Sequence, residues 1–231
     1  MRGEQVSRVE GFSDAAFAFA LTLLVISLEV PRSFDGILDQ LKGLPAFAAC
    51  FAILVWLWSA HYRFFRRYGL EDVPTIALNA AFLFVVMLFV FPLKFSFTIF
   101  LGMITGLQPA NTGRIALHQV DDLFILYGAG FIAVFGLLGW MTLRAWKLRE
   151  ALELNEMERL VTREELTRCF SLVGLGVAAV IVAIVLPDRW SGMSGLMYGL
   201  IGVIEFTLGK RFAGPRERTL AAMRERGELP V

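Results

Sequence analysis

The polar residues best placed to do chemistry lie in a short segment that leads into the first apolar block. This segment reads Arg8-Val9-Glu10-Gly11-Phe12-Ser13-Asp14. Ser13 or Asp14 can cap the first turn of a helix, because their oxygens accept hydrogen bonds from its free N–H groups. A carboxylate within an apolar membrane segment costs about 2.5–3.5 kcal/mol at mid-membrane, and less near its ends, so it usually has a partner. We expect Arg8 or His61 to be the partner of Asp14.

The residues after Asp14 form an apolar stripe on the predicted helix. With Phe19 at zero, Thr22 lies at about −60°, Leu23 at about +40° and Ile26 at about −20°. Asp14 lies near −140° on the same helical wheel, so we expect it to face other helices of its own subunit. Spacing alone makes such a stripe ordinary lipid or core packing as readily as the lining of a pore.

The composition requires a membrane around this helix. The chain has 231 residues, of which 57% are hydrophobic and 19% charged, and its mean hydropathy is +0.64. Soluble domains have about 45–50% apolar residues, so a soluble globular protein is a poor interpretation. The net charge of +1 gives no basic surface, and therefore predicts no nucleic-acid partner.

Six blocks are long and apolar enough to cross a bilayer as helices. Strands of a barrel are disfavoured because period-2 alternation is absent. Of the 22 Lys and Arg residues, 17 fall on one side of the predicted topology, so the positive-inside rule places both termini in the cytoplasm. We predict an all-α integral membrane domain over 1–212 and a charged cytoplasmic tail over 213–231, with spans at about 11–30, 43–62, 73–93, 123–143, 169–187 and 190–209.

Several segments are less regular. The uncharged stretch 95–113 is rich in Gly and is either an outward extension of the third helix or a re-entrant hairpin. The linker 147–168 is amphipathic and predicts a cytoplasmic helical hairpin or surface helix. We expect no cleavable signal peptide. Cys50 and Cys169 lie at different predicted depths, so we expect no disulfide, and no Cys/His spacing suggests a metal.

The motif Arg8-x-x-x-Phe12-Ser13-Asp14, followed by Thr22 and a helix end near Val30-Pro31, resembles the signature of the transmembrane protein 175 family of potassium channels. Trp58-x-x-His61 and Asn79 support the resemblance, which covers about residues 8–93 and extends further only by hydropathy. It implies a prokaryotic, single-repeat member that is no enzyme: a six-helix subunit, assembled as a homotetramer in the plasma membrane, with K⁺ as the permeant ion and no cofactor.

The resemblance also implies roles for individual residues. The first helices of four subunits would line a leak-type, K⁺-over-Na⁺ pore without the TVGYG filter, a motif that does not occur in this sequence. The constriction maps to Phe19, where the family usually has Ile or Leu, so either Phe19 or Leu23 is the narrowest point. Thr22, Leu23 and Ile26 would continue the pore, and Thr22 would help to discriminate K⁺ from Na⁺. The motif residues would form a structural cluster: Arg8, Phe12, Ser13, Asp14, Trp58, His61 and Asn79.

The sequence leaves open the role of Glu29 and the choice between a channel and other functions. On the helical wheel Glu29 lies at about −80°, at the edge of the stripe. At this position, two roles are equally compatible with the sequence. Glu29 either concentrates cations at the outer mouth or is an interfacial side chain that snorkels to the membrane surface. A proton- or cation-coupled transporter using Asp14, Glu29 and Glu205 is the alternative, although no related halves are visible. No motif of a membrane enzyme occurs, and a membrane scaffold is compatible with the sequence.

Overall fold

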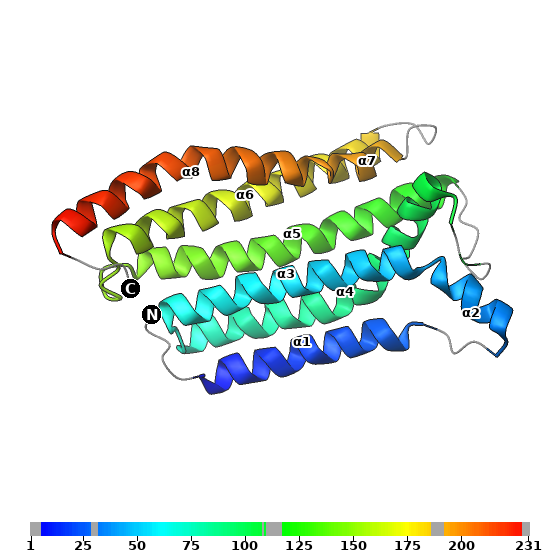
Figure 1. The fold of residues 1–231 in the computed structure, drawn as a ribbon, viewed down its shortest axis with the longest axis horizontal. Helices are drawn as coiled ribbons and strands as arrows, with labels where there is room; N and C mark the ends of the chain where they lie inside the picture. Colours follow the sequence, from blue (N-terminus) through cyan, green and yellow to red (C-terminus); the bar gives the residue numbers. More distant parts are fainter. Residues whose placement is uncertain (1–5, 29–31, 108, 110–116, 186–191, 228–231) are drawn as a thin grey trace.

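A computed structural model describes residues 6–28, 32–107, 109, 117–185 and 192–227, and within these ranges the chain is all-helical. This confirms the all-α part of the predicted fold class. The elements are α1 (Arg8–Ile26), α2 (Phe34–Leu41), α3 (Leu44–Tyr68), α4 (Val73–Thr105), α5 (Leu117–Lys147), α6 (Glu156–Val185), α7 (Gly192–Met197) and α8 (Leu200–Glu225) (Figure 1).

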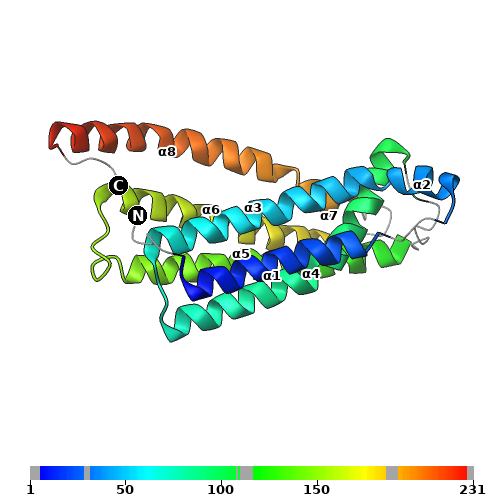
Figure 2. The ribbon, with the colours of Figure 1, turned by 60° about the horizontal axis from the view of Figure 1, so that its bottom comes forward.

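The long helices lie side by side as an elongated bundle. In Figure 1, α1 forms one edge, α8 forms the opposite edge, and α3 to α6 lie between them. α1 packs on α3 and α4, α5 packs on α4 and α6, and α8 packs on α6. α1 therefore has neighbours on one side only, and its other side is on the outside of the bundle (Figure 2).

Five helices in the described ranges are long and apolar enough to cross a membrane: α1, α3, most of α4 and α5, and α6. The predicted sixth span, 190–209, corresponds to α7 and the first part of α8, with a turn at Tyr198 and Gly199 between them. Trp190 lies outside the described residues. This span is therefore interrupted, although α8 still runs along α6 (Figure 1).

α4 resolves the choice that the sequence left open after residue 93. It continues as a helix through Pro92 to Thr105, where Gly106 adopts a left-handed conformation (φ +70°) and ends it. The described part of 95–113 is thus an extension of the third long helix. Pro92 removes one backbone hydrogen bond and crowds the preceding turn, and the helix changes direction in its later turns (Figure 1).

The prediction for the linker 147–168 is wrong in part, and the charged tail begins as a helix. The linker 147–168 contains only a short turn, and from Glu156 onward it belongs to α6, so it forms neither a separate hairpin nor a surface helix. The charged tail predicted from residue 213 is helical as far as Glu225, because α8 continues through Pro215. Ion pairs between α6 and α8 compensate for the charges here, including Arg226–Glu156 at 2.7 Å and Arg168–Glu205 at 3.0 Å.

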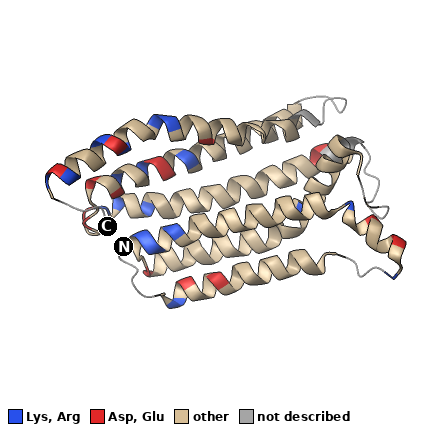
Figure 3. Cartoon of the chain, in the orientation of Figure 1, with Lys and Arg blue, Asp and Glu red and all other residues tan. Residues whose placement is uncertain are grey.

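Charged residues gather at the end of the bundle where α1 begins and α8 ends (Figure 3). Asp72, the residue before α4, pairs there with Arg144 at the end of α5 and accepts a hydrogen bond from Thr75. Desolvation raises the pKa of Asp72, but the hydrogen bonds from Thr75 and Arg144 outweigh it, so the pKa lies below its usual value of 3.8. This ion pair connects two long helices at their charged ends.

The buried core runs between the long helices and contains both cysteines as free thiols. Cys50 on α3 and Cys169 on α6 are 0% and 2% exposed. The expectation that they form no disulfide is confirmed. Their burial in an apolar core is the ordinary behaviour of cysteine as a small hydrophobic residue.

Candidate pore helix and the polar cluster behind it

α1 begins one turn earlier than the sequence pattern suggests. Ser7 is its N-cap, and the Ser7 hydroxyl accepts a hydrogen bond of 3.1 Å from the Glu10 backbone N–H. Ser13 and Asp14, the two caps that the sequence allows, therefore do not cap the helix. Both residues lie in the second turn, so their side chains are free to contact other helices.

Ser13, Asn79 and His61 form a buried chain of hydrogen bonds across α1, α4 and α3. The Ser13 hydroxyl donates to the Val9 carbonyl at 2.8 Å and accepts from the Asn79 Nδ2 at 2.9 Å. The Asn79 Oδ1 lies 2.7 Å from His61 Nε2. Because an amide oxygen only accepts, His61 carries its proton on Nε2. All three side chains are at most 2% exposed, so the chain joins three helices within the core.

Aromatic rings surround His61. Its imidazole stacks on Phe82 with 5.6 Å between ring centroids and an interplanar angle of 12°, and it contacts Phe65 at 4.8 Å and Phe17 at 5.7 Å. These rings come from α4, α3 and α1 respectively. The burial of the His61 imidazole and its contact with Asn79 are typical of a histidine with a structural role.

Asp14 has a different partner from the two that we expected. Its Oδ1 accepts a hydrogen bond of 2.7 Å from the Trp58 indole Nε1 on α3. Arg8 is exposed and makes no ion pair with any described residue. The prediction of the direction in which Asp14 points is confirmed, but the partner is a neutral donor. Arg8 is thus outside the cluster formed by Ser13, Asp14, Trp58, His61 and Asn79.

A second polar contact holds the other end of α1. The Lys94 ammonium on α4 donates to the Ser27 carbonyl at 2.6 Å and to its hydroxyl at 2.8 Å. Ser27 is the C-cap of α1. A cation at this position satisfies a free carbonyl and meets the negative end of the helix dipole. α1 is therefore attached at both ends through the same side, with Phe17, Ala20 and Leu24 buried between.

The opposite side of α1 lacks neighbours in the described part of the chain. Phe12, Phe19 and Ile26 are 65%, 55% and 67% exposed, and Thr22 is exposed as well. The Thr22 hydroxyl donates to the Ala18 carbonyl at 2.9 Å, and its oxygen accepts no hydrogen bond from the described residues. Three of the four stripe residues, Phe19, Thr22 and Ile26, therefore lie on the open face of the helix, together with Phe12.

Leu23 departs from this arrangement, because it is half-buried and packs against the core. The exposed arc extends instead to Val25, which is 52% exposed. On the helical wheel Val25 lies at about −120° and Phe12 at about +20°, so the arc is centred close to Thr22. The open face thus has Thr22 near its middle and Phe19 towards one side.

The acids proposed for a transporter do not meet. Asp14 is on α1 and Glu205 on α8, at opposite edges of the bundle (Figure 1), and each has its own partner. Glu29 lies outside the described residues. Among the described residues no group of His, Cys, Asp or Glu is arranged to hold a metal ion.

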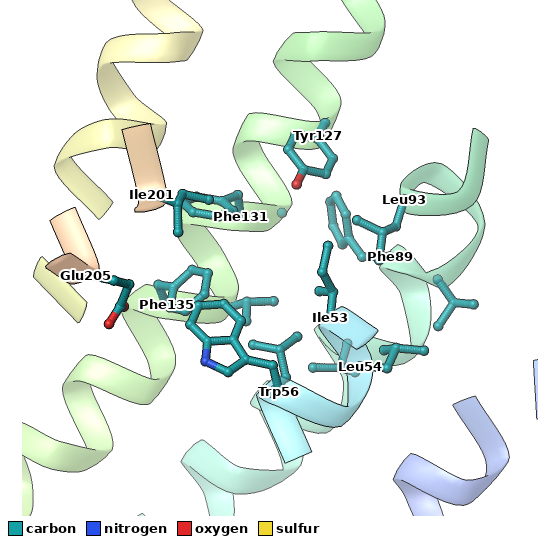
Figure 4. A pocket seen from close by; sticks show the side chains of 15 residues that line it. Ile53, Leu54, Trp56, Phe89, Leu93, Tyr127, Phe131, Phe135, Ile201 and Glu205 are labelled. Atoms are coloured by element: carbon teal, nitrogen blue, oxygen red, sulfur yellow. The ribbon is translucent and has the colours of Figure 1, made fainter. Parts of the chain in front are cut away.

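An apolar cavity of about 350 Å³ lies between α3, α4, α5 and α8, away from α1. Figure 4 shows Phe89, Tyr127 and Phe131 around it and Glu205 at its margin. Because the Glu205 Oε2 accepts a hydrogen bond of 3.0 Å from Arg168, this acid is already engaged. The cavity contributes nothing to the exposed face of α1.

Sequence reasoning missed two residues that position α1. Lys94 stands as a lone charge in an apolar stretch, and a charge at such a place usually has a partner, which was the signal for its contact with Ser27. Glu10 is 3% exposed in the first turn of α1, where a carboxylate meets the positive end of the helix dipole.

Comparison with known proteins places this arrangement in a family. Residues 8–90, which contain the whole polar cluster, match the family described as "Endosomal/lysosomal potassium channel TMEM175". A potassium channel of Marivirga tractuosa is 33% identical over 220 residues, which cover 90% of this chain and 88% of the relative. The chain belongs to the TMEM175 family of potassium channels.

Two further similar proteins agree with this assignment. The potassium channel Cha6605_3372 of Chamaesiphon minutus is 32% identical over 96 residues, or 38% of this chain and 47% of the relative. The crystal structure of the potassium channel MtTMEM175 in complex with a Nanobody-MBP fusion protein matches with a TM-score of 0.79 and 32% identity. The match covers 92% of this chain and 96% of that one. The TMEM175 family is a channel family and not an enzyme class, so this chain is a membrane protein related to potassium channels.

Proposed function

We propose that this chain is a K⁺-over-Na⁺ leak channel of a prokaryotic plasma membrane, in which four copies surround a pore lined by α1. Both termini face the cytoplasm, and the segment around α7 and α8 provides the sixth crossing. The observation that carries the proposal is the asymmetry of α1. Buried polar contacts attach one side of it to its own subunit, while Phe19, Thr22 and Ile26 stay exposed on the other.

A tetramer accounts for the exposed face better than lipid contact alone. One subunit cannot enclose an ion path with a single exposed helix face, whereas four identical faces around an axis can. The Thr22 hydroxyl also lies near the middle of the exposed face. Acyl chains have no hydrogen-bond donor for the Thr22 oxygen, so contact with lipid would not explain a hydroxyl at this place. Relatives from bacteria that are named potassium channels support the same reading.

Selectivity follows from dehydration at an apolar neck. Four Phe19 rings would exclude water and form a hydrophobic constriction. K⁺ gives up its hydration shell at a lower free-energy cost than Na⁺, and the Thr22 oxygens one turn further on would replace part of that shell. The neck would also limit the rate of conduction. At the outer mouth, Glu29 would concentrate cations.

The first test is the single-channel conductance in planar bilayers. Phe19→Ala is expected to raise the K⁺ conductance several-fold, because it removes the largest side chain of the neck. The matched control is Phe84→Ala on α4, since Phe84 is similarly exposed (64%) but lies outside α1. An unchanged conductance in Phe19→Ala, or an equal change in Phe84→Ala, would contradict a constriction at Phe19.

The second test is the K⁺/Na⁺ permeability ratio. Thr22→Val keeps the shape of the side chain but removes its oxygen, so the ratio is expected to fall. Thr207→Val is the control, because Thr207 on α8 is also exposed and also donates to the carbonyl four residues earlier, at 2.8 Å. If Thr22→Val leaves the ratio unchanged while the conductance of Phe19→Ala is also normal, α1 does not line the pore.

A further inference from the structure

A second cavity, of about 420 Å³, lies between the beginning of α4 and the end of α5. Its apolar wall includes Ala77, Leu78 and Leu143, and its cationic rim consists of Arg144 and Lys147. It is separate from α1 and from the cavity in Figure 4. A pocket whose lining is mostly apolar and includes two cations fits a ligand with an apolar body and an anionic head.

The position of this pocket matches the edge of a membrane. α4 enters its apolar stretch at Val73 and α5 leaves its own at Lys147, so the rim lies where both helices meet the charged end of the bundle (Figure 3). Trp140, Arg144 and Lys147 follow one another at i, i+4 and i+7 and therefore share one face of α5. Trp140 is 61% exposed, and tryptophan is enriched at the level of lipid headgroups.

Arg144 and Lys147 can both still bind an anion. Lys147 is exposed and makes no ion pair within the described ranges of the chain. Arg144 contacts Asp72 through Nη2, but its Nε is buried and makes no hydrogen bond with the described residues. The Asp72 carboxylate balances one of the two positive charges, which leaves about one unit of positive charge at the rim.

We propose that this pocket binds one anionic glycerophospholipid of the leaflet at the charged end of the bundle. Its phosphate lies between Lys147 and Arg144, and an acyl chain lies along Ala77, Leu78 and Leu143. Basic pockets between transmembrane helices on the cytoplasmic side bind anionic headgroups elsewhere. A zwitterionic lipid fits less well, because its headgroup brings a second cation beside Lys147. This inference needs the membrane location of the chain and is independent of the pore.

The test is lipid titration of the intact, full-length assembly in detergent, followed by native mass spectrometry. The probes are phosphatidylglycerol and phosphatidylcholine with the same acyl chains. We expect phosphatidylglycerol to bind about tenfold more tightly. Lys147→Gln should weaken its binding about fivefold, as expected for one Lys near an anionic lipid surface, and should leave phosphatidylcholine unaffected. Ala77→Trp, which fills the cavity and keeps every charge, should abolish saturable binding of phosphatidylglycerol.

Arg218→Gln is the matched control for charge, because Arg218 is exposed on α8 at the same end of the bundle and is not in the pocket. An equal loss in Arg218→Gln and Lys147→Gln would show that the attraction is diffuse and overturn the proposal. Normal binding in Ala77→Trp would overturn it as well. Displacement of the lipid by millimolar inorganic phosphate would assign the pocket to a free anion, and a change in subunit number in Ala77→Trp would assign this face to a subunit contact.

Discussion

Replacing Asn79 by Ala tests whether the buried chain of hydrogen bonds holds α1 in place. The substitution removes the contact of 2.7 Å with His61 and the contact of 2.9 Å with Ser13. Each hydrogen bond contributes about 1 kcal/mol net, and a buried donor left without a partner costs about 1–3 kcal/mol. Pairwise couplings measured inside membranes are smaller, about 0.6 kcal/mol on average. We therefore expect a loss of about 2–3 kcal/mol in unfolding free energy.

The assay is reversible unfolding in mixed micelles, followed by the fluorescence of the tryptophans. A cycle with Ser13→Ala, Asn79→Ala and the double variant isolates the contact between the two side chains, with an expected coupling of about 0.5–1.5 kcal/mol. Asn155→Ala is the control, because the Asn155 Oδ1 accepts a hydrogen bond of 2.8 Å from the nearby Glu158 N–H at the start of α6, away from α1. Additive effects of Ser13→Ala and Asn79→Ala would refute the contribution of this contact.

Two further predictions concern the packing and the charged end of the bundle. A Cβ atom at Gly130 on α5 would lie 1.8 Å from the Phe89 ring, whereas one at Gly136 would meet nothing within 4 Å. Gly130→Ala should therefore lower the melting temperature, with a cost of about 1–3 kcal/mol, and Gly136→Ala should leave it equal or raise it; the reverse order would contradict the packing described. The Asp72–Arg144 pair should stabilise the wild type relative to Asp72→Asn above pH 3.8, the usual pKa. Because the pKa of Asp72 is lowered in the folded state, this advantage should disappear as the pH falls below that value, and an advantage that persists in acid would contradict the pair.

The sequence predicts much of the fold, because a bilayer imposes length and hydropathy on every crossing. The lower accuracy at helix ends has physical causes. α4 continues past Pro92 and α8 past Pro215, although proline in a helix interior is unfavourable by about 3 kcal/mol. The polar start of α6 reads as a linker in isolation, and ion pairs with α8, such as that of Glu156 with Arg226, come from residues distant in sequence.

The candidate site was predictable where one helix determines the answer. The helical wheel identified the exposed side of α1 with Phe19, Thr22 and Ile26, because their relative angles depend only on the helix period. Leu23, which the wheel placed on the same stripe, is half-buried, since the limit of the exposed arc depends on the neighbouring helices. The prediction of the partner of Asp14 was wrong for the same reason. A charge argument favours Arg8 or His61, whereas the fold presents the indole of Trp58.

The polar motif and the exposed face of α1 are two consequences of one constraint on this helix. Displacing the helix by a single residue would rotate its side chains by about 100°, which would replace Thr22 on the open face by a neighbour. The contacts of Ser13, Asp14 and Ser27 all lie on the inner side, so together they oppose both rotation and sliding. If α1 lines the proposed pore, the motif residues therefore need no contact with an ion to affect conduction. Under the proposed function, Asn79→Ala should alter the permeability ratio even though Asn79 is buried behind α1, whereas Asn155→Ala should not.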